Sequence, residues 1–437
     1  MSTVKINFEK QAGKINIMHA VNNGPCVAGP DQTRGNQDDY KAARIPYART
    51  HDASFFAGYG GEHTVDIRAI FPNFDADVND PESYDFACTD VYMRNILKYG
   101  SKPFYRLGSR IEHEVRKYGT LPPKDFQKWA EICEHIISHY TEGWANGYNY
   151  DMEYWEIWNE PDLDPDDSKN KRCWGGTEAE FARLFIIAAK HLKNRFPHLK
   201  IGGPALAGNE EYLERLLARA KAENTPLDFV SWHWYWTEPT DLAKKCVRVR
   251  DIMNKCGYEN AESICNEWNY VRGWTDEFVY SIEQIISMKG AAFTAACMSA
   301  CENTQVVDML MYYDARPTAF NGLFDMYTYR PLKGYYPFVM YSRLYELGAK
   351  CESSSDDEDV YVVSATDGKT KRAMITYYAE DDNKSGKIVY VDMGCTCGAK
   401  VFVTDKDSTM REIEPVVENG QIKLRLQRNS IVLIEQA

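Results

Sequence analysis

Residues 154–162 read Tyr-Trp-Glu-Ile-Trp-Asn-Glu-Pro-Asp, a short apolar run that ends in an amide and a carboxylic acid. Its aromatic and branched side chains over 154–158 are typical of a buried strand. A helical pattern follows at 178–196. Thr177 and Glu180 stand in the positions of a capping box at its start, and Pro197 ends it. A strand followed by a helix is the repeating unit of a parallel sheet.

The same unit recurs along most of the chain. Short apolar runs that predict buried strands lie at 14–21, 43–50, 102–107, 154–158, 199–203, 228–234, 262–266 and 307–313. Amphipathic stretches that predict helices separate most of them, for example at 126–140, 178–196, 209–222, 241–256 and 276–300. Eight strands alternating with helices predict an α/β fold, a (β/α)8 TIM barrel. An open doubly wound sheet is less favoured, because no Gly-rich phosphate turn follows the first strand.

The pattern changes after residue 348. Short β-rich stretches separated by turn residues lie at 359–365, 372–378, 386–392, 400–404, 421–425 and 430–435. They predict a smaller C-terminal antiparallel β-sandwich. We therefore expect a catalytic barrel at 14–348 and an accessory sandwich at 349–437. An alternating segment within residues 1–13 could join this sandwich as a strand.

Charge limits the possible partners. The 437 residues carry a formal net charge of −13. A nucleic acid or an anionic membrane surface requires a basic face, so we expect neither as a partner. A neutral ligand such as an oligosaccharide or glycoside is compatible with this charge, and a homo-oligomer is possible.

The N-terminal residues are polar, and the sequence has no apolar run long enough for a membrane helix. Unless a leader has been removed, we expect a cytoplasmic protein. The twelve cysteines form no paired CxxC motifs with zinc-site spacing. Cys395 and Cys397 are the closest pair. We expect reduced thiols, no metal and no cofactor.

Two carboxylic acids carry the strongest chemical signal. Glu160 follows the fourth expected strand and Glu267 follows the seventh, and each is preceded by Asn. In a TIM barrel both would open onto the C-terminal face, where catalytic groups lie. Hydrolysis of a glycosidic bond generally uses such a pair, one acid protonated and one ionised. We expect Glu160 to be the acid/base and Glu267 the nucleophile. The alternative is that either is an exposed loop carboxylate or a helix-cap partner.

Neighbouring strand ends supply candidate substrate-binding residues. Along 231–236, alternation places His233 and Tyr235 on one face and three tryptophans on the other. Tyr235 could hydrogen-bond Glu267, and His233 could bind a sugar hydroxyl or change the pKa of a carboxyl group. The other expected binding residues end strands or lie in the loops that follow them: Asn159, Arg49, His51, Asp52, Tyr313 and Phe324. Salt bridges or loop caps are the alternative roles for the residues at 49–52.

These motifs resemble clan A glycoside hydrolases, and within that clan the chain is most similar to glycoside hydrolase family 39. The resemblance rests on Trp-Asn-Glu-Pro at 158–161, Ser-Trp-His-Trp-Tyr at 231–235, Asn-Glu at 266–267, Arg-Thr-His-Asp at 49–52 and Gly-Leu-Phe at 322–324. It covers the barrel, roughly residues 14–345, and a barrel with a small appended sandwich is also the layout of that family. It implies a retaining mechanism with Glu160 as acid/base and Glu267 as nucleophile.

The resemblance implies a β-xylosidase first, but the chain departs from those enzymes in two places. The eighth expected strand ends in Met-Tyr-Tyr-Asp at 311–314, where xylosidases carry a Trp, and Trp268 and Asn269 follow the expected nucleophile. Other sugars therefore stay open: an α-L-arabinosidase, a β-galactosidase or β-glucosidase, or an α-L-iduronidase. An iduronidase would need cations for the substrate carboxylate, for which Arg272, Arg316 and Lys333 are candidates.

Two other classes of protein are compatible with a barrel. One is a sugar-binding protein without turnover, which the carboxyl pair argues against. The other is a metal-dependent hydrolase, for which the sequence lacks His clusters. The leading expectation is a retaining exo-glycosidase that acts on short oligosaccharides.

Overall fold

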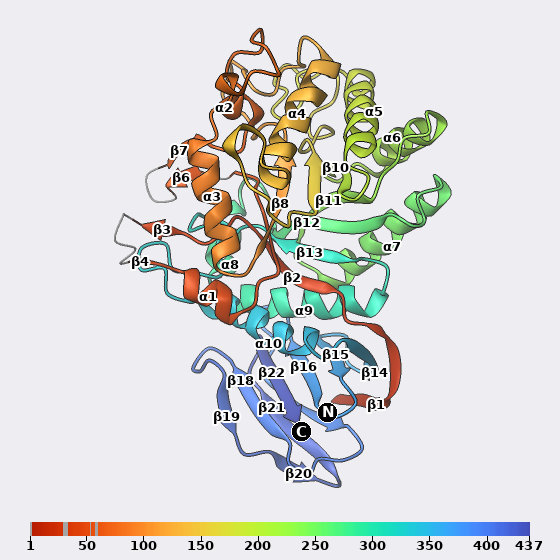
Figure 1. Cartoon of the computed structure of the whole chain (residues 1–437). Helices are drawn as coiled ribbons and strands as arrows, with labels where there is room; N and C mark the ends of the chain where they lie inside the picture. Colours follow the sequence, from red (N-terminus) through yellow and green to blue (C-terminus); the bar gives the residue numbers. More distant parts are fainter. Residues whose placement is uncertain (1, 29–33, 53, 57–59) are drawn as a thin grey trace.

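The computed structural model describes residues 2–28, 34–52, 54–56 and 60–437. Figure 1 shows a barrel surrounded by helices, with a sheet domain packed against one side of it. Both ends of the chain lie at the sheet domain.

Eight parallel strands close into a barrel, which confirms the expected TIM-barrel fold. In order around the barrel they are β2 (Ile17–Asn22), β5 (Tyr47–Arg49), β8 (Lys102–Leu107), β9 (Tyr154–Ile157), β10 (Lys200–Leu206), β11 (Phe229–Trp236), β12 (Glu262–Tyr270) and β13 (Met309–Tyr312). The expected strand at 43–50 is shorter, because Ala43 caps the preceding helix and the strand begins at Tyr47. Side chains such as Phe104, Tyr154 and Phe229 form a separate apolar cluster contributed by the barrel strands.

Helices cover the outside of the barrel (Figure 1). The longer ones are α3 (Ala87–Lys98), α4 (Phe126–Thr141), α5 (Glu178–Arg195), α6 (Glu210–Ala222), α7 (Pro239–Lys255), α8 (Phe278–Ile285), α9 (Met288–Thr304) and α10 (Tyr336–Tyr345). The single helix expected at 276–300 is wrong. The structure divides it into α8 and α9, and the Ser287 side chain accepts a hydrogen bond from Lys289 N at the start of α9. Apolar residues continue across this break, so their spacing gave no sign of it.

Short elements occupy the connections. They are β3 (Val27–Ala28), β4 (Arg34–Gly35), α1 (Gln37–Ala42), β6 (Ser54–Phe56), β7 (Gly60–His63), α2 (Ile67–Ile70), and single 3-10 turns at Pro81–Ser83, Trp144–Asn146 and Lys333–Tyr335. β3 pairs with β4 and β6 pairs with β7 as small antiparallel ribbons. β6 and β7 belong to the connection that follows β5 in the chain.

The second domain is one ten-stranded, mostly antiparallel sheet. Its strands are β1 (Ser2–Lys14), β14 (Ala349–Ser355), β15 (Val360–Thr366), β16 (Lys371–Tyr377), β17 (Lys387–Asp392), β18 (Lys400–Thr404), β19 (Arg411–Ile413), β20 (Val416–Glu418), β21 (Gln421–Leu426) and β22 (Ser430–Gln436). β1 pairs antiparallel with β14 and parallel with β17, so the N-terminal segment does join this sheet; residue 1 lies outside the described residues. Apolar side chains from both halves of the sheet share one core, as a sandwich requires.

The two domains share a packed boundary. Val363, Met374 and Leu433, from β15, β16 and β22, belong to the same apolar cluster as the barrel helices. Figure 1 shows α9 and α10 between the barrel and this sheet. No helix in the described part of the chain combines the length and apolar character that crossing a membrane needs.

The start of α5 provides a test of local stability. Thr177 Oγ1 accepts from Glu180 N at 3.2 Å, and the Glu180 carboxylate accepts from Thr177 N at 2.8 Å, which confirms the expected capping box. Thr177→Ala should lower the free energy of unfolding by about 1 kcal/mol, because a helix donor loses its partner. Denaturant unfolding would measure this loss. Thr177→Ser keeps the hydroxyl and should retain most of the stability. Equal midpoints for Thr177→Ala and the unchanged chain would contradict the capping role.

Candidate active site

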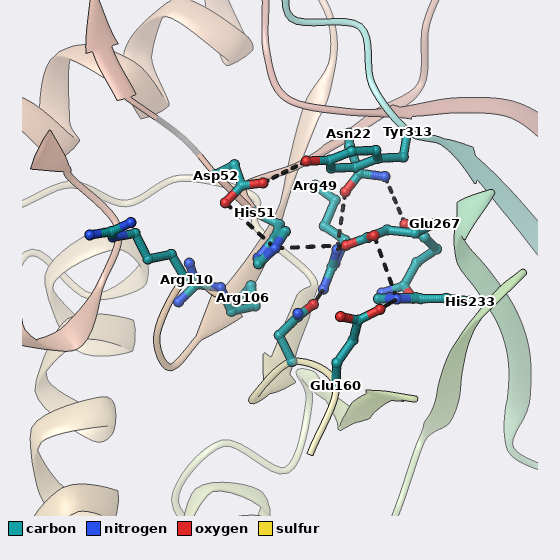
Figure 2. A network of polar contacts seen from close by, with 12 residues as sticks. Asn22, Arg49, His51, Asp52, Arg106, Arg110, Glu160, His233, Glu267 and Tyr313 are labelled. Carbon is teal, nitrogen blue, oxygen red and sulfur yellow. Dashed lines mark hydrogen bonds and ion pairs between the residues drawn. The ribbon is translucent and has the colours of Figure 1, made fainter. Parts of the chain in front are cut away.

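The C-terminal ends of the barrel strands bring the two expected carboxylic acids together (Figure 2). Glu160 follows β9 and Glu267 lies within β12. One carboxylate oxygen of Glu160, one carboxylate oxygen of Glu267 and one ring nitrogen of His233 all lie within 4.8 Å of one another. Retaining glycosidases hold their two carboxyl groups about 5 Å apart, and inverting enzymes hold them farther apart. Carboxyl oxygens this close to each other are compatible with the retaining arrangement.

Glu267 is held by two strong donors. Arg49 Nη1 donates to Oε1 at 2.6 Å, and the Tyr235 hydroxyl donates to Oε2 at 2.8 Å. His233 Nδ1 lies 3.5 Å from Oε2. Burial raises the pKa of Glu267, while the neighbouring His233 and Arg49 oppose this rise, as does the hydrogen bond from Tyr235. These donors favour the ionised carboxylate.

Glu160 has a different environment. Its Oε1 lies 2.8 Å from His233 Nδ1, and the Cys173 thiol is 3.7 Å from Oε2. Burial raises the pKa of Glu160 to about 7, and the charge of Arg49 opposes this rise only in part, since no Lys or Arg among the described residues contacts Glu160 directly. This carboxyl group can therefore hold or release a proton near neutral pH.

His233 is an uncharged partner for Glu160. Burial lowers the pKa of His233 to about 4, so the imidazole is neutral at neutral pH. A neutral ring nitrogen either donates one hydrogen bond or accepts one. His233 Nδ1 can thus donate to the ionised Glu160 or accept from the protonated form. The contact is compatible with both protonation states of Glu160.

The backbone around Glu160 adopts a conformation that is uncommon for residues other than glycine. Trp158 has φ 74°, Glu160 has φ 47° and Ala205 at the end of β10 has φ 56°. Glu160 N donates to Ala205 O at 2.8 Å, which ties the two strand ends together. Left-handed backbone of this kind costs on the order of 1 kcal/mol or more per residue and is concentrated at functional sites. It turns the Glu160 side chain toward His233.

Arg49 connects most of the polar groups beneath the carboxyl pair. Besides Glu267, the guanidinium donates to Glu156 Oε2 at 2.7 Å, Asn159 Oδ1 at 2.7 Å and Asn22 Oδ1 at 3.1 Å. Arg49 and Glu156 are both fully buried. Sequence reasoning missed Glu156 as a site residue. The signal was available, because a charged residue inside an apolar strand must find a buried partner.

The buried nitrogen atoms next to the carboxyl groups include two in particular that have no hydrogen-bond partner among the described residues. They are Asn159 Nδ2 and His233 Nε2. Buried polar groups are nearly always paired in folded proteins, and exceptions call for a functional explanation. A ligand with hydroxyl groups would supply the missing partners. Both residues were expected to bind substrate.

His51, Asp52 and Tyr313 form a second polar group beside Glu267 (Figure 2). The Tyr313 hydroxyl donates to Asp52 Oδ2 at 2.6 Å. His51 Nε2 lies 3.6 Å from Asp52 Oδ1 and 3.8 Å from Glu267 Oε1. Burial alone would raise the pKa of Asp52, but His51 and Arg316 lower it below its usual value. The structure thus brings these three expected residues to one side of the carboxyl pair.

Phe324 is the expected binding residue that the structure places elsewhere. It is only 1% exposed and stacks on Tyr40, with ring centroids 5.9 Å apart, so it offers no face to a sugar. Phe320 in the same loop borders the site instead. Its ring centroid lies 5.6 Å from that of Tyr313 and 6.3 Å from that of Tyr235. The loop after β13 has no periodic pattern, so the sequence could not distinguish these two phenylalanines.

Trp274 is a further aromatic residue that sequence reasoning missed. It is 58% exposed and packs edge-on against Tyr235 at 5.2 Å. The tryptophans of β11 face away from the carboxyl groups, as alternation predicted: Trp232 Nε1 donates to Ser263, and Trp234 stacks near Phe293 of α9.

The three cations considered for binding a substrate carboxylate already have partners. Arg272 donates to Glu380 at 2.6 Å, and Lys333 donates to Ser408 O at 2.8 Å. Arg316 contacts the Asp52 carbonyl and lies 3.3 Å from Asp314. None of the three points a free charge at the carboxyl pair.

Glu160, His233 and Glu267 are also a combination that could hold a metal ion. Both Glu267 oxygens, however, already accept short hydrogen bonds, and the Arg49 guanidinium that supplies one of them would repel a cation. The arrangement suits acid–base and nucleophilic chemistry better than metal binding.

The chain is similar in sequence to proteins of a known family. The model of the family described as Glycosyl hydrolases family 39 matches residues 2–283. A β-xylosidase from Caldicellulosiruptor saccharolyticus is 28% identical over 252 residues, which are 55% of this chain and 47% of that protein. A β-xylosidase from Geobacillus stearothermophilus is 27% identical over 216 residues, 43% of this chain and 41% of that protein. The chain thus matches less than half the length of either curated relative.

Solved structures show the same fold. A glucosidase from Croceicoccus marinus superposes with a TM-score of 0.79 at 21% identity, covering 100% of this chain and 98% of that one. A monomeric β-xylosidase from Caulobacter crescentus superposes with a TM-score of 0.70 at 17% identity, covering 99% of both chains.

The raised pKa of Glu160 predicts a pH-dependent stability. Between its ordinary pKa of 4.5 and about 7, the folded state binds the proton more tightly than the unfolded state. Stability should therefore fall as pH rises through this window, by up to about 3 kcal/mol. Glu160→Gln removes the titrating group and should reduce the fall. Denaturant unfolding of both proteins at pH 5 and pH 8 measures the difference. Identical pH dependence in the two proteins would contradict the raised pKa.

Proposed function

We propose that this chain, which belongs to glycosyl hydrolases family 39, is a retaining exo-glycosidase that cleaves short oligosaccharides. The observation that carries the proposal is the pair Glu160 and Glu267. One carboxylate oxygen of each lies within 4.8 Å of the other. Their environments differ as the two roles require. The acid, Glu160, contacts the uncharged His233, whereas the nucleophile, Glu267, accepts hydrogen bonds from Arg49 and Tyr235.

In the first step, Glu267 attacks the anomeric carbon and forms a covalent glycosyl ester. The bond from that carbon to the leaving-group oxygen breaks, and Glu160 gives its proton to this oxygen. In the second step, Glu160 removes a proton from water, the water oxygen bonds to the anomeric carbon, and the ester to Glu267 breaks. Two displacements at one carbon retain its configuration.

The change of charge during the cycle lets Glu160 play both parts. Two neighbouring carboxylates raise each other's pKa. When Glu267 becomes an ester its charge is lost, so the pKa of Glu160 falls and the group can accept a proton from water. His233 Nδ1 can contact Glu160 in either state.

We infer that several buried groups bind the sugar. Asn159 Nδ2 has no partner among the described residues, which supports a role in holding the hydroxyl next to the anomeric carbon. His51, Asp52 and Tyr313 lie beside Glu267 and supply further donors and acceptors. Asp52 contacts both His51 and Tyr313. We infer that these side chains close one side of the carboxyl pair and that the enzyme therefore removes terminal sugars.

β-Xylosidase is the leading activity, supported by the names of the two curated relatives. The same mechanism could serve an α-L-arabinosidase or a β-galactosidase or β-glucosidase. An α-L-iduronidase is less favoured, since Arg272, Arg316 and Lys333 are engaged with protein groups. A sugar-binding protein without turnover would not need a carboxyl group whose pKa lies near 7.

Glu267→Gln should abolish turnover, because an amide cannot form the glycosyl ester. The measurement is release of nitrophenol from a panel of nitrophenyl glycosides, with the xyloside expected to be the best substrate. Asp381→Asn, at an exposed position in the sheet domain, is the matched control and should behave like the unchanged enzyme. Turnover by Glu267→Gln at the normal rate would reject its role, and binding of oligosaccharides without any product would favour the non-catalytic alternative.

Glu160→Ala should separate substrates by their leaving groups. A poor leaving group such as a sugar needs protonation, so its kcat/KM should fall by about 100-fold or more, while dinitrophenyl glycosides should be cleaved at nearly the normal rate of glycosylation. In the unchanged enzyme, activity on a disaccharide should fall as pH rises through about 7, because Glu160 loses its proton. Equal losses on both kinds of substrate would count against the acid role.

A further inference from the structure

An exposed aromatic ring stands at the outer end of the site. Trp274 is 58% exposed and lies in the loop that follows β12, the strand that carries Glu267. Its ring meets Tyr235 edge-on at 5.2 Å, and Tyr235 donates to Glu267. The Tyr235 side chain therefore contacts both the Trp274 indole and the nucleophile, Glu267. The ring centroid of Trp274 also lies 6.1 Å from that of Phe320, which borders the same site.

The position of Trp274 suits the leaving group. Tyr235 is two residues beyond His233 on β11, and His233 contacts both Glu160 and Glu267. Trp274 thus lies outward of the residue that joins the two carboxyl groups. In the proposed function the terminal sugar lies on the buried side next to Asp52 and Tyr313, and the leaving group then extends toward solvent. A large ring with an apolar face exposed there is available for stacking.

The loop that carries Trp274 is fixed by the other domain. Glu380, which follows β16 of the C-terminal sheet, accepts from Arg272 Nη2 at 2.6 Å and Nε at 3.1 Å. The same carboxylate accepts from the Tyr270 hydroxyl at 2.9 Å. Tyr270 and Arg272 are the residues four and two positions before Trp274.

Further donors hold Glu380 in place. The Tyr378 hydroxyl donates at 2.9 Å, and Lys289 Nζ lies 3.1 Å from Oε2 and donates to the Glu380 carbonyl at 2.6 Å. The Arg272 guanidinium also lies over the Tyr280 ring at 4.0 Å. Charge-assisted bonds to several donors fix the orientation of a carboxylate. Glu380 therefore acts as an anchor for the loop at residues 270–277.

We propose that Trp274 is the binding platform for the leaving-group sugar and that Glu380 of the C-terminal sheet positions this platform through Arg272. The inference rests on the proposed glycosidase function. It assigns the sheet domain a part in substrate recognition, and Glu380 is a positioning residue that touches no substrate.

The first test compares two substrates that share a terminal sugar. Xylobiose has a sugar as leaving group, and β-xylosyl fluoride has a single atom. Trp274→Ala should lower kcat/KM for xylobiose by about tenfold, the scale of one lost aromatic contact, and leave the fluoride unchanged. Trp274→Phe should keep most of the activity. Equal losses on both substrates would overturn the platform. If the unchanged enzyme cleaves neither these nor the matching pair for any other sugar, the proposed function fails, and this inference fails with it.

The second test asks whether Glu380 acts through Trp274. Glu380→Ala should show the same selective loss on xylobiose, Glu380→Gln should recover most of it, and Asp381→Asn should show none. Combined with Trp274→Ala, Glu380→Ala should add little further loss, since coupled residues are not additive. A lower unfolding midpoint without a selective effect on xylobiose would show that Glu380 only stabilises the fold, and fully additive losses would also overturn the positioning role.

Discussion

The buried guanidinium of Arg49 is the interaction on which the site depends. Burial deprives the carboxylates of Glu156 and Glu267 of hydration, at a cost of several kcal/mol each, and a cation between them offsets this cost. Arg49 is 2.7 Å from one and 2.6 Å from the other. Its remaining donors orient Asn22 and Asn159. One side chain from β5 thus joins groups from β2, β9 and β12, and the closed barrel holds all of them at fixed distances.

The two carboxyl groups of the pair gain different properties from their contacts. Glu267 accepts from a cation and a hydroxyl, whereas Glu160 faces a neutral imidazole. Left-handed backbone at Trp158 and Glu160 holds the second group in place and is stabilised by the surrounding barrel. Burial that costs stability in one place therefore produces a proton donor near neutral pH.

Much of this arrangement could be predicted from the sequence. The strands recur with clear periodicity, and barrel geometry brings Glu160 and Glu267 to the same face whatever the intervening loops do. The loops themselves could not be predicted in this way. Phe324 is buried while Phe320 borders the site, because the path after β13 depends on tertiary packing. The contacts of Glu380 with Arg272 join residues more than a hundred positions apart, and no local sequence pattern predicts such contacts.

The place of β1 has a consequence for how the chain folds. This first strand lies between β14 and β17, so in the described part of the chain the backbone pairing between the two halves of the sheet runs only through it. During synthesis β1 leaves the ribosome long before its partner strands β14 and β17 have been made. It therefore stays unpaired while the barrel forms. Unpaired strands invite association with other chains. The charged residues Lys5, Glu9 and Lys10 alternate with or follow its buried positions, and they disfavour such pairing until the last strands arrive.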